Sequence, residues 1–240
     1  MELELELKLS PNRIDLDSIE EWLIVEENNF KKSFYRNWNV IEKAFNENKL
    51  FTLSINNVPK GFIVWRNNEI YADIDIFVIE SNSRRKGIGR ILFEKFIDHL
   101  KSIDLYAIKL FCSPRESEKF WRKMGFLQFP NRGYSESDLT FYKPLIEIES
   151  PTETPNNLNK LELWNVEPYR KNYEMPKWTW NLNSNTESLS RPIFQPCNCN
   201  WNLRWTKNGK IIRDDKIKYF ETIDNQIDFS PFLYITRLTE

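Results

Sequence analysis

The sequence has few of the residues that most often bind metals or act as nucleophiles. Its 240 residues include a single histidine, His99, and three cysteines, Cys112, Cys197 and Cys199. Zinc sites draw on several Cys and His ligands, so no metal site is expected. A Ser-His-Asp or Cys-His mechanism would have to use His99, which lies in a predicted helix and is interpreted as structural. The odd number of cysteines favours reduced thiols and therefore a cytoplasmic protein.

Long apolar runs, a basic N-terminus and an excess of charge are also missing. The longest apolar runs have the length of strands, so no membrane span is expected. The chain starts with alternating glutamate and leucine, which argues against a secretory signal. Lys and Arg number 34 against 35 Asp and Glu, a balance that argues against nucleic acid as a partner. The hydrophobic fraction of 40% is typical of a folded globular chain and excludes a mostly disordered one.

Two prolines among small polar residues divide the chain. Residues 150–157 read SPTETPNN, which cannot continue a helix or a central strand and therefore predicts a linker. Residues 1–149 alternate strand and helix patterns. Residues 158–240 hold five of the nine tryptophans and predict a small β-rich lobe of unknown function.

Apolar spacing in residues 1–149 predicts a mixed α/β (α+β) sheet flanked by helices. The expected element order is β-α-α-β-β-β-α-β-α-β-β. The predicted strands are 2–9, 50–55, 62–66, 70–80, 106–112, 126–129 and 139–142; the predicted helices are 15–30, 37–48, about 90–100 and 114–124, with a turn over 56–61.

A basic, glycine-containing loop lies between a predicted strand and a predicted helix. Residues 84–90 read RRKGIGR, and they include two of only six glycines in the chain. The first N–H groups of a helix lack internal partners and carry partial positive charge, and glycine lets an anion approach the backbone. A pyrophosphate is the natural ligand for such a loop. The alternative is a solvated basic turn.

Two segments together resemble the Gcn5-related N-acetyltransferase (GNAT) family. Arg84, Gly87 and Gly89 match the family's Q/R-x-x-G-x-G/A loop, and residues 120–126 (FWRKMGF) match its aromatic-rich turn after a later helix. The resemblance covers about residues 1–145. It implies a mixed, mostly antiparallel sheet and an N-acetyltransferase that uses acetyl-CoA as co-substrate. The dinucleotide-binding fingerprint does not fit, because no third glycine follows Gly89 at the required spacing.

The resemblance also implies which residues bind acetyl-CoA. Backbone N–H groups of the loop would hold the pyrophosphate, and the end of the fourth strand would pair with the pantetheine arm inside a V-shaped slot. A late-helix residue, tyrosine in many members, is Trp121 here. The implied cofactor-binding residues are Phe77, Val78, Ile79, Arg84, Arg85, Lys86, Gly87, Ile88, Gly89, Arg90 and Trp121.

Asp73 is the first candidate for the general base. Transfer to an amine requires a neutral amine, and a carboxylate can accept its proton directly or through water. A strand period of two predicts that Asp73, Asp75, Phe77 and Ile79 share one face, with both carboxylates in line with the acetyl group. Their charge suggests a cationic acceptor, either a small molecule or a peptide. The alternative is that both aspartates are solvent-facing.

The acid that protonates the leaving thiolate is not evident. Trp121 cannot act as an acid, and Pro114 replaces the asparagine common in the family. The thiolate either leaves unassisted or takes a proton from another donor such as Tyr142 or Ser113. Cys112 is interpreted as a buried structural thiol, so direct transfer in a ternary complex is expected.

The C-terminal segment carries one strong local signal. Residues 207–210 (KNGK) lie between two strand-like runs, 201–206 and 211–213, and predict a hairpin. Further strands are expected at 216–221 and 232–238. The tryptophans are expected to pack on the acetyltransferase core or on a partner chain, and a homodimer is left open.

Two other functions also stay open at this stage. One is an acyl-CoA-binding regulatory module with little turnover. The other is an acetyltransferase toxin that acts on charged tRNA, against which the near-neutral charge argues.

Overall fold

The computed structural model describes residues 5–31, 33–133, 138–156, 158–183, 188–220 and 231–238. The chain divides into two compact units. Unit 1 comprises Met1–Gln128 and Leu139–Leu145, and unit 2 comprises Phe129–Asp138 and Ile146–Glu240. The linker at residues 150–157 stays a prediction; there, the N–H of Thr152 donates to the carbonyl of Thr179 inside unit 2 (2.7 Å).

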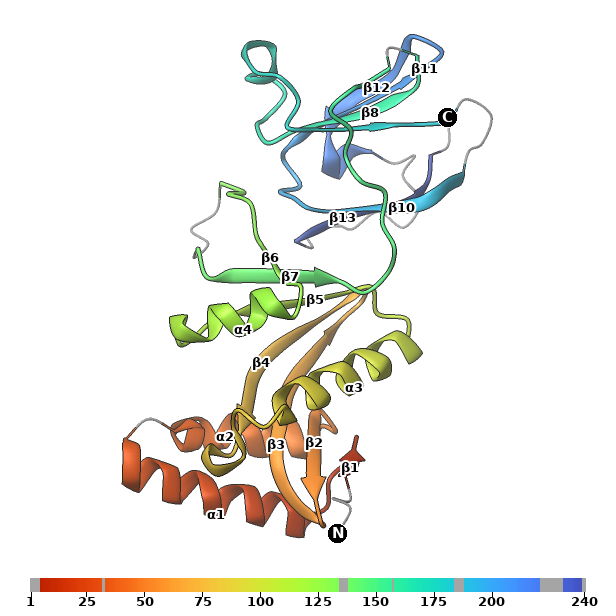
Figure 1. The fold of residues 1–240 in the computed structure, drawn as a ribbon. Helices are drawn as coiled ribbons and strands as arrows, with labels where there is room; N and C mark the ends of the chain where they lie inside the picture. Colours follow the sequence, from red (N-terminus) through yellow and green to blue (C-terminus); the bar gives the residue numbers. More distant parts are fainter. Residues whose placement is uncertain are drawn as a thin grey trace. The chain divides into compact units, whose positions relative to one another are not determined.

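Unit 1 is a seven-stranded mixed sheet with helices on both faces (Figure 1). The strand order is β1-β2-β3-β4-β5-β7-β6, and the β4–β5 pair is parallel while the other pairs are antiparallel. This confirms the mixed, mostly antiparallel sheet. The strands are β1 (Leu5–Lys8), β2 (Leu50–Ile55), β3 (Val58–Asn68), β4 (Tyr71–Ile79), β5 (Ala107–Phe111), β6 (Leu127–Gln128) and β7 (Thr140–Pro144).

Helices of unit 1 lie near the predicted positions, with shifts at their ends. Asn12 caps the first helix, because its side chain accepts the N–H of Asp15 while the Asp15 carboxylate accepts the N–H of Asn12. That helix therefore begins two residues earlier than expected. The helices are α1 (Arg13–Phe30), α2 (Trp38–Asn46), α3 (Ile88–Ser102) and α4 (Glu118–Lys123), with short 3₁₀ turns η1 (Phe34–Asn37), η2 (Ser81–Ser83) and η3 (Arg115–Ser117).

The turn predicted over residues 56–61 is much shorter in the structure. Asn56 and Asn57 both have positive φ, 49° and 63°, and they close a two-residue hairpin in which Ile55 pairs with Val58. Asparagine tolerates this backbone conformation, which matches the twist of the flanking strands. β3 therefore starts at Val58 and includes Pro59, which lies next to an irregularity in the β2–β3 pairing. Residues 2–4 of the predicted first strand lie outside the described residues.

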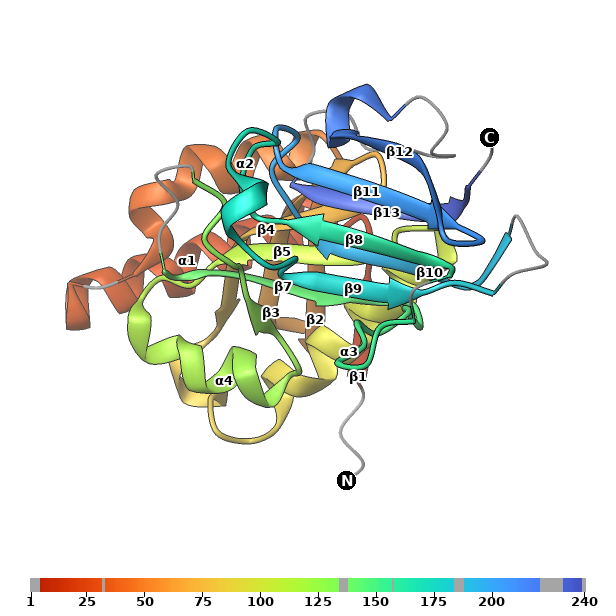
Figure 2. The same cartoon turned by 90° about the horizontal axis from the view of Figure 1, so that it is seen from above.

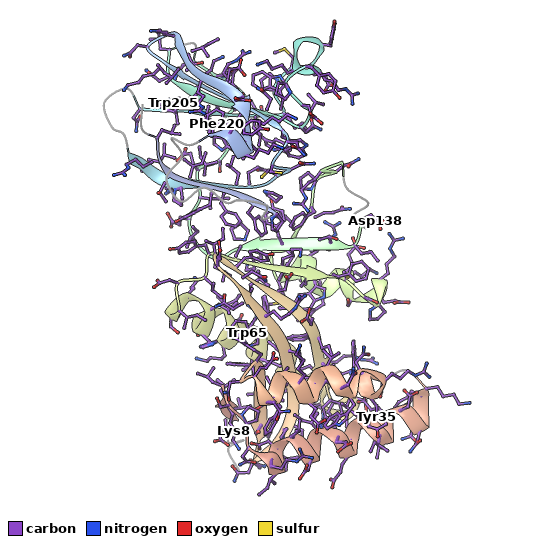
Figure 3. The ribbon with its side chains drawn as sticks, turned by 180° about the vertical axis from the view of Figure 1, so that it is seen from behind. Lys8, Tyr35, Trp65, Asp138, Trp205 and Phe220 are labelled. Atoms are coloured by element: carbon purple, nitrogen blue, oxygen red, sulfur yellow. The ribbon has the colours of Figure 1, made fainter. Side chains whose placement is uncertain are left out.

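Two apolar clusters cover the two faces of the sheet. One packs α3 and α4 on the sheet through residues such as Phe96, Trp121 and Trp65, the last of which Figure 3 labels. The other packs α1 and α2 on the opposite face through residues such as Leu16 and Ile41. Among the described helices, none is long and apolar enough to span a bilayer.

His99 lies in the α3 packing layer. Its ring contacts Phe51 (6.0 Å between centroids) and Trp65 (5.8 Å). Burial, and secondarily the charge of Lys49, lowers the pKa of His99 below its usual 6.5. The sequence interpretation of His99 as structural fits this contact.

This shift predicts a loss of stability at mildly acidic pH. Below about pH 6.5 the unfolded chain binds a proton on His99 that the folded chain does not, so stability falls as the pH decreases. Replacing His99 with glutamine should flatten the dependence of the unfolding midpoint on pH between 7.5 and 5.5. Thermal unfolding of both proteins across this range tests the prediction, and equal slopes would contradict it.

Unit 2 contains a four-stranded sheet, in the order β12-β11-β8-β9, and a two-stranded sheet, β10–β13. Figure 2 shows the strands of the larger sheet side by side. Asn208 and Gly209, both with positive φ, close the predicted hairpin, and Lys207 pairs with Lys210. The strands are β8 (Lys160–Trp164), β9 (Trp178–Asn181), β10 (Ser188–Pro196), β11 (Asn202–Lys207), β12 (Lys210–Lys216) and β13 (Phe232–Arg237).

Two expectations for the C-terminal part are wrong in detail. Residues 217–219 form a 3₁₀ turn, η5 (Ile217–Tyr219), rather than a strand, and residue 221 lies outside the described residues. Trp180, Trp201 and Trp205 pack in unit 2's own core, to which Phe220 also belongs. Figure 3 labels Trp205 and Phe220. These three indoles therefore stabilise the unit that contains them.

Candidate functional site

The site begins where β4 and β5 separate. The two strands pair in parallel from Tyr71 with Ala107 to Ile74 with Leu110. Beyond Ile74, β4 continues along β3 as far as Ile79, while the end of β5 pairs with β7. The strand edges then enclose a pocket of about 490 Å³, walled by β4, β5, the loop before α3, the segment 113–121 and η1. This is the slot that the sequence resemblance implies.

A row of backbone N–H groups without acceptors lies at the start of α3. Gly87 is the N-cap residue and has φ +82°, and no side chain caps the helix. The carbonyl of Gly87 accepts the N–H groups of Arg90 (3.0 Å) and Ile91 (3.1 Å). Among the described residues, no acceptor faces the N–H groups of residues 85–89. The row is therefore free to bind an anion.

Gly89 separates this row from β4. A Cβ built on Gly89 would lie 3.4 Å from the Ile79 side chain and 3.6 Å from the Phe77 ring. These are ordinary contact distances, but any larger side chain would extend over the pocket, which Phe77, Ile79 and Gly89 all line. Glycine at this position keeps the backbone accessible from the pocket.

The basic residues of the loop differ in what they contact. Arg84 is half-exposed but held by protein groups: its Nε donates to the carbonyl of Ile79 (2.7 Å) and its Nη2 to the Glu26 carboxylate (3.1 Å). Arg90 pairs with Glu94 at the surface. Arg85 lines the pocket, whereas the exposed Lys86 does not. Of the basic side chains of the loop, Arg84 and Arg90 therefore already have protein partners.

Aromatic rings form another part of the pocket wall. Trp121 is buried and stands edge-on to Phe77, with 5.1 Å between ring centroids. Phe120 lies against both rings. All three line the pocket. The side chains of Val78 and Ile88 point into the apolar clusters instead, and of their backbone groups the N–H of Ile88 is the one that stays available to a ligand.

A β-bulge at Asp75 corrects the predicted arrangement of β4. Val64 pairs with Ile76 and the next residue, Trp65, pairs with Ile74, so Asp75 is the extra residue. The bulge reverses the alternation of the strand. Ile74 and Phe77 therefore pack on the same face, and Asp73 does not share a face with Phe77 and Ile79 as predicted. Asp75 lines the pocket and Asp73 does not.

Both carboxylates have cationic partners. Asp73 accepts from the ammonium of Lys109 (3.0 Å) and the amide of Asn68 (3.1 Å). Asp75 accepts two hydrogen bonds from Arg66 (2.7 and 2.8 Å). Two acids and two bases give a locally neutral cluster, so the acidic face expected from the sequence is not present.

The other predicted residues lie at different distances from the pocket. Tyr142 is buried, which raises its pKa to about 12, and it does not line the pocket. Ser113 and Pro114 do line it. Cys112 is buried and its Sγ lies 3.2 Å from the hydroxyl of Ser117. No cluster of His, Cys, Asp and Glu that could hold a metal occurs in the described part of the chain.

Sequence reasoning missed several residues of this site. Phe34 of η1, Phe111 at the end of β5 and Ser117 all line the pocket. Glu26 of α1 contacts the loop from the other side. These residues are far apart in the chain and carry no motif. The sequence showed that these residues are apolar or lie in a predicted helix, but it did not indicate that they lie at the site.

Three solved structures illustrate the likeness to known proteins. Ard1 from Thermoplasma volcanium is 18% identical, with 60% of this chain and 99% of that chain covered and a TM-score of 0.46. The PaiA N-acetyltransferase from Thermoplasma acidophilum in complex with coenzyme A is 16% identical, with 59% of this chain and 99% of that chain covered and a TM-score of 0.49. The ribosomal-protein-S18-alanine N-acetyltransferase from Escherichia coli is 18% identical, with 63% of this chain and 100% of that chain covered and a TM-score of 0.45.

The sequence itself matches a protein family. No curated protein matches the chain significantly. The model of the acetyltransferase (GNAT) family matches residues 16–126, which include the slot, the loop before α3 and the turn after α4. Residues 16–126 therefore form an acetyltransferase domain of the GNAT family.

Proposed function

We propose that the protein transfers an acetyl group from acetyl-CoA to an amine. The observation that carries this proposal is the row of unpartnered N–H groups at residues 85–89, which opens onto the slot. The dipole of α3 adds positive potential at the same point, so a pyrophosphate would be stabilised there. The coenzyme A complex of the PaiA N-acetyltransferase supports the choice of co-substrate.

The slot would hold the arm of the co-substrate. After Ile74, the edge of β4 that β5 no longer covers offers backbone groups to the pantetheine amides. Arg84 already occupies the carbonyl of Ile79, and the backbone groups of Val78 face β3, which leaves Phe77 as the backbone position for this contact. The rings of Phe77, Phe120 and Trp121 would exclude water from the thioester.

The chemical step is attack of the amine nitrogen on the thioester carbon. A lysine-like amine with pKa near 10.4 is less than about 0.1% neutral at pH 7, so a base is required. We assign this role to Asp75, the acidic side chain of β4 that lines the pocket, and keep Asp73 acting through water as its rival. The carbon–nitrogen bond forms, the carbon–sulfur bond breaks, and the amine proton passes to the carboxylate.

The leaving thiolate has two neighbouring hydroxyl groups. Ser113 and Ser117 line the pocket, whereas Tyr142, although it stays protonated at neutral pH, does not. Cys112 is buried against Ser117 and has no histidine partner in a chain whose only histidine is on α3. Direct transfer in a ternary complex is therefore the mechanism that we propose. The cytoplasmic location and the homodimer stay predictions.

A second candidate is an acyl-CoA-binding module with little turnover. Trp121 favours it, because an indole at the position of the family's tyrosine cannot donate a proton to sulfur. In this case the slot and the N–H row would bind the co-substrate without fast transfer.

Titration of acetyl-CoA by calorimetry, followed by release of free thiol with a panel of amines, tests both candidates. We expect saturable 1:1 binding and thiol release with at least one class of amine. Binding without release for any amine would favour the module. Absence of binding at millimolar acetyl-CoA would overturn the proposed function.

A further inference from the structure

Glu26 of α1 is a buried carboxylate directed at the loop before α3. It is 4% exposed. Its Oε1 accepts the backbone N–H of Ser81 (2.6 Å), and its Oε2 accepts from Nη2 of Arg84 (3.1 Å). A buried charge is costly unless it is paired and hydrogen-bonded, and here both conditions are met by residues of the loop.

Arg84 extends the same connection to β4. Its Nε donates to the carbonyl of Ile79, so one guanidinium joins α1, the end of β4 and the loop. The following residue, Arg85, has φ +60°, and the N–H row starts there. The direction of the row is therefore set by the residue immediately before it, and that residue is held by Glu26.

A second contact holds the opposite end of the turn. Glu80 accepts from the hydroxyl of Ser83 (2.9 Å) and from the ammonium of Lys60 (2.9 Å). This contact fixes η2 to β3 but does not reach residues 84–89. The position of the N–H row thus depends on the pair of Glu26 and Arg84 more than on the neighbouring ion pair.

We propose that Glu26 is a positioning residue for the co-substrate loop, acting through Arg84. The inference rests on the proposed function, because it assumes that the loop binds a pyrophosphate. Without the carboxylate, the half-exposed Arg84 side chain keeps only its hydrogen bond to the carbonyl of Ile79, and the N–H groups of residues 85–89 are held less firmly in one direction. Preorganised donors are what make such an anion site effective, so affinity for the pyrophosphate falls.

The contacts make a specific prediction about which ligand loses affinity. Glu26→Gln keeps the size of the side chain, and its amide oxygen can still accept the N–H of Ser81 while the charge that holds Arg84 is removed. We expect acetyl-CoA to bind at least tenfold more weakly to this variant. S-acetylpantetheine, which has no pyrophosphate, should bind unchanged because the slot between β4 and β5 is not altered.

Calorimetry with acetyl-CoA and ligand-observed NMR with S-acetylpantetheine measure the two affinities. Glu27→Gln is the matched control, because Glu27 lies in the same helix and does not contact the loop. Its carboxylate likewise accepts hydrogen bonds from a backbone N–H, that of Ser33, and from an arginine side chain, that of Arg36. The ratio of the two affinities should stay at the wild-type value in this control. If Glu26→Gln does not fold, Arg84→Gln removes the same ion pair from the other side. The double variant should bind acetyl-CoA no more weakly than the single variant with the lower affinity.

Each alternative result has a distinct meaning. If the wild type binds acetyl-CoA and Glu26→Gln binds it equally well, the positioning role is wrong and the proposed function stands. If both ligands weaken together, Glu26 supports the whole fold rather than the loop, and the inference is overturned. If the wild type binds neither ligand, the proposed function fails and this role fails with it.

Discussion

Replacing Gly89 with glutamate should weaken acetyl-CoA binding at least 100-fold. The Cβ of the new side chain would contact Ile79 and Phe77, and the rest of the side chain would extend from there into the pocket. Its carboxylate would lie beside the N–H groups that are free for the pyrophosphate, so it would both fill the space and repel the anion. A 100-fold change corresponds to about 2.7 kcal/mol of binding free energy.

Calorimetry gives the affinity, and thermal unfolding shows that the variant is folded. Because the added Cβ makes only ordinary contacts at 3.4–3.7 Å, we expect the unfolding midpoint to change little. Lys95→Glu serves as control: it adds a carboxylate to the exposed side of the same helix, where Lys95 pairs only with Asp98 in the described part of the chain. Affinity of that variant should stay within a few-fold of wild type. Wild-type affinity in Gly89→Glu would show that the loop is not the anion site.

The loop before α3 is a feature that the sequence predicts well, and the reason is local. A strand, two glycines and a helix follow one another within a few residues, and the N–H groups of a helix start have no internal acceptors. The same holds for the hairpin at Asn208 and Gly209, where two adjacent residues with positive φ determine the turn. Such features depend on neighbouring residues and need no knowledge of the tertiary structure.

The bulge at Asp75 and the orientation of Arg84 depend on distant residues. Tyr71 to Ile79 reads as a regular strand, and only the register against β3 shows that Asp75 is the extra residue. Arg84 looks like a free cation in the sequence, yet Glu26 pairs with it from 58 positions earlier. The predicted shared face therefore needed correction, and the partner of Arg84 could not be foreseen.

In unit 2 a strand was correctly expected at β13, whereas β8, β9 and β10 were missed. β8 is five residues long and pairs with β11, about 40 residues later, as in the pair of Leu163 and Leu203. Its burial on both faces gives no alternation that would distinguish it from a buried helical turn. Long-range pairing, rather than propensity, determines this part of the fold.

The largest expected effect on catalysis is that of Asp75→Asn. If Asp75 removes the amine proton, the amide variant should lose about 100- to 1000-fold in kcat, with the affinity for acetyl-CoA unchanged. In the variant the rate should rise steadily with pH, because only the small neutral fraction of the amine reacts. Steady-state kinetics with an amine found by the thiol-release screen measures these effects.

Asp73→Asn separates the two carboxylates. It leaves the ammonium of Lys109 part-buried without its acidic partner, so we expect a lower unfolding midpoint and only a small change in kcat. Asp75→Glu should recover part of the activity, because it restores a carboxylate beside the pocket. The reverse pattern, with kcat lost in Asp73→Asn and kept in Asp75→Asn, would assign the base to Asp73. In that case the acceptor amine would have to approach from the face of the sheet that carries Asp73 and Lys109.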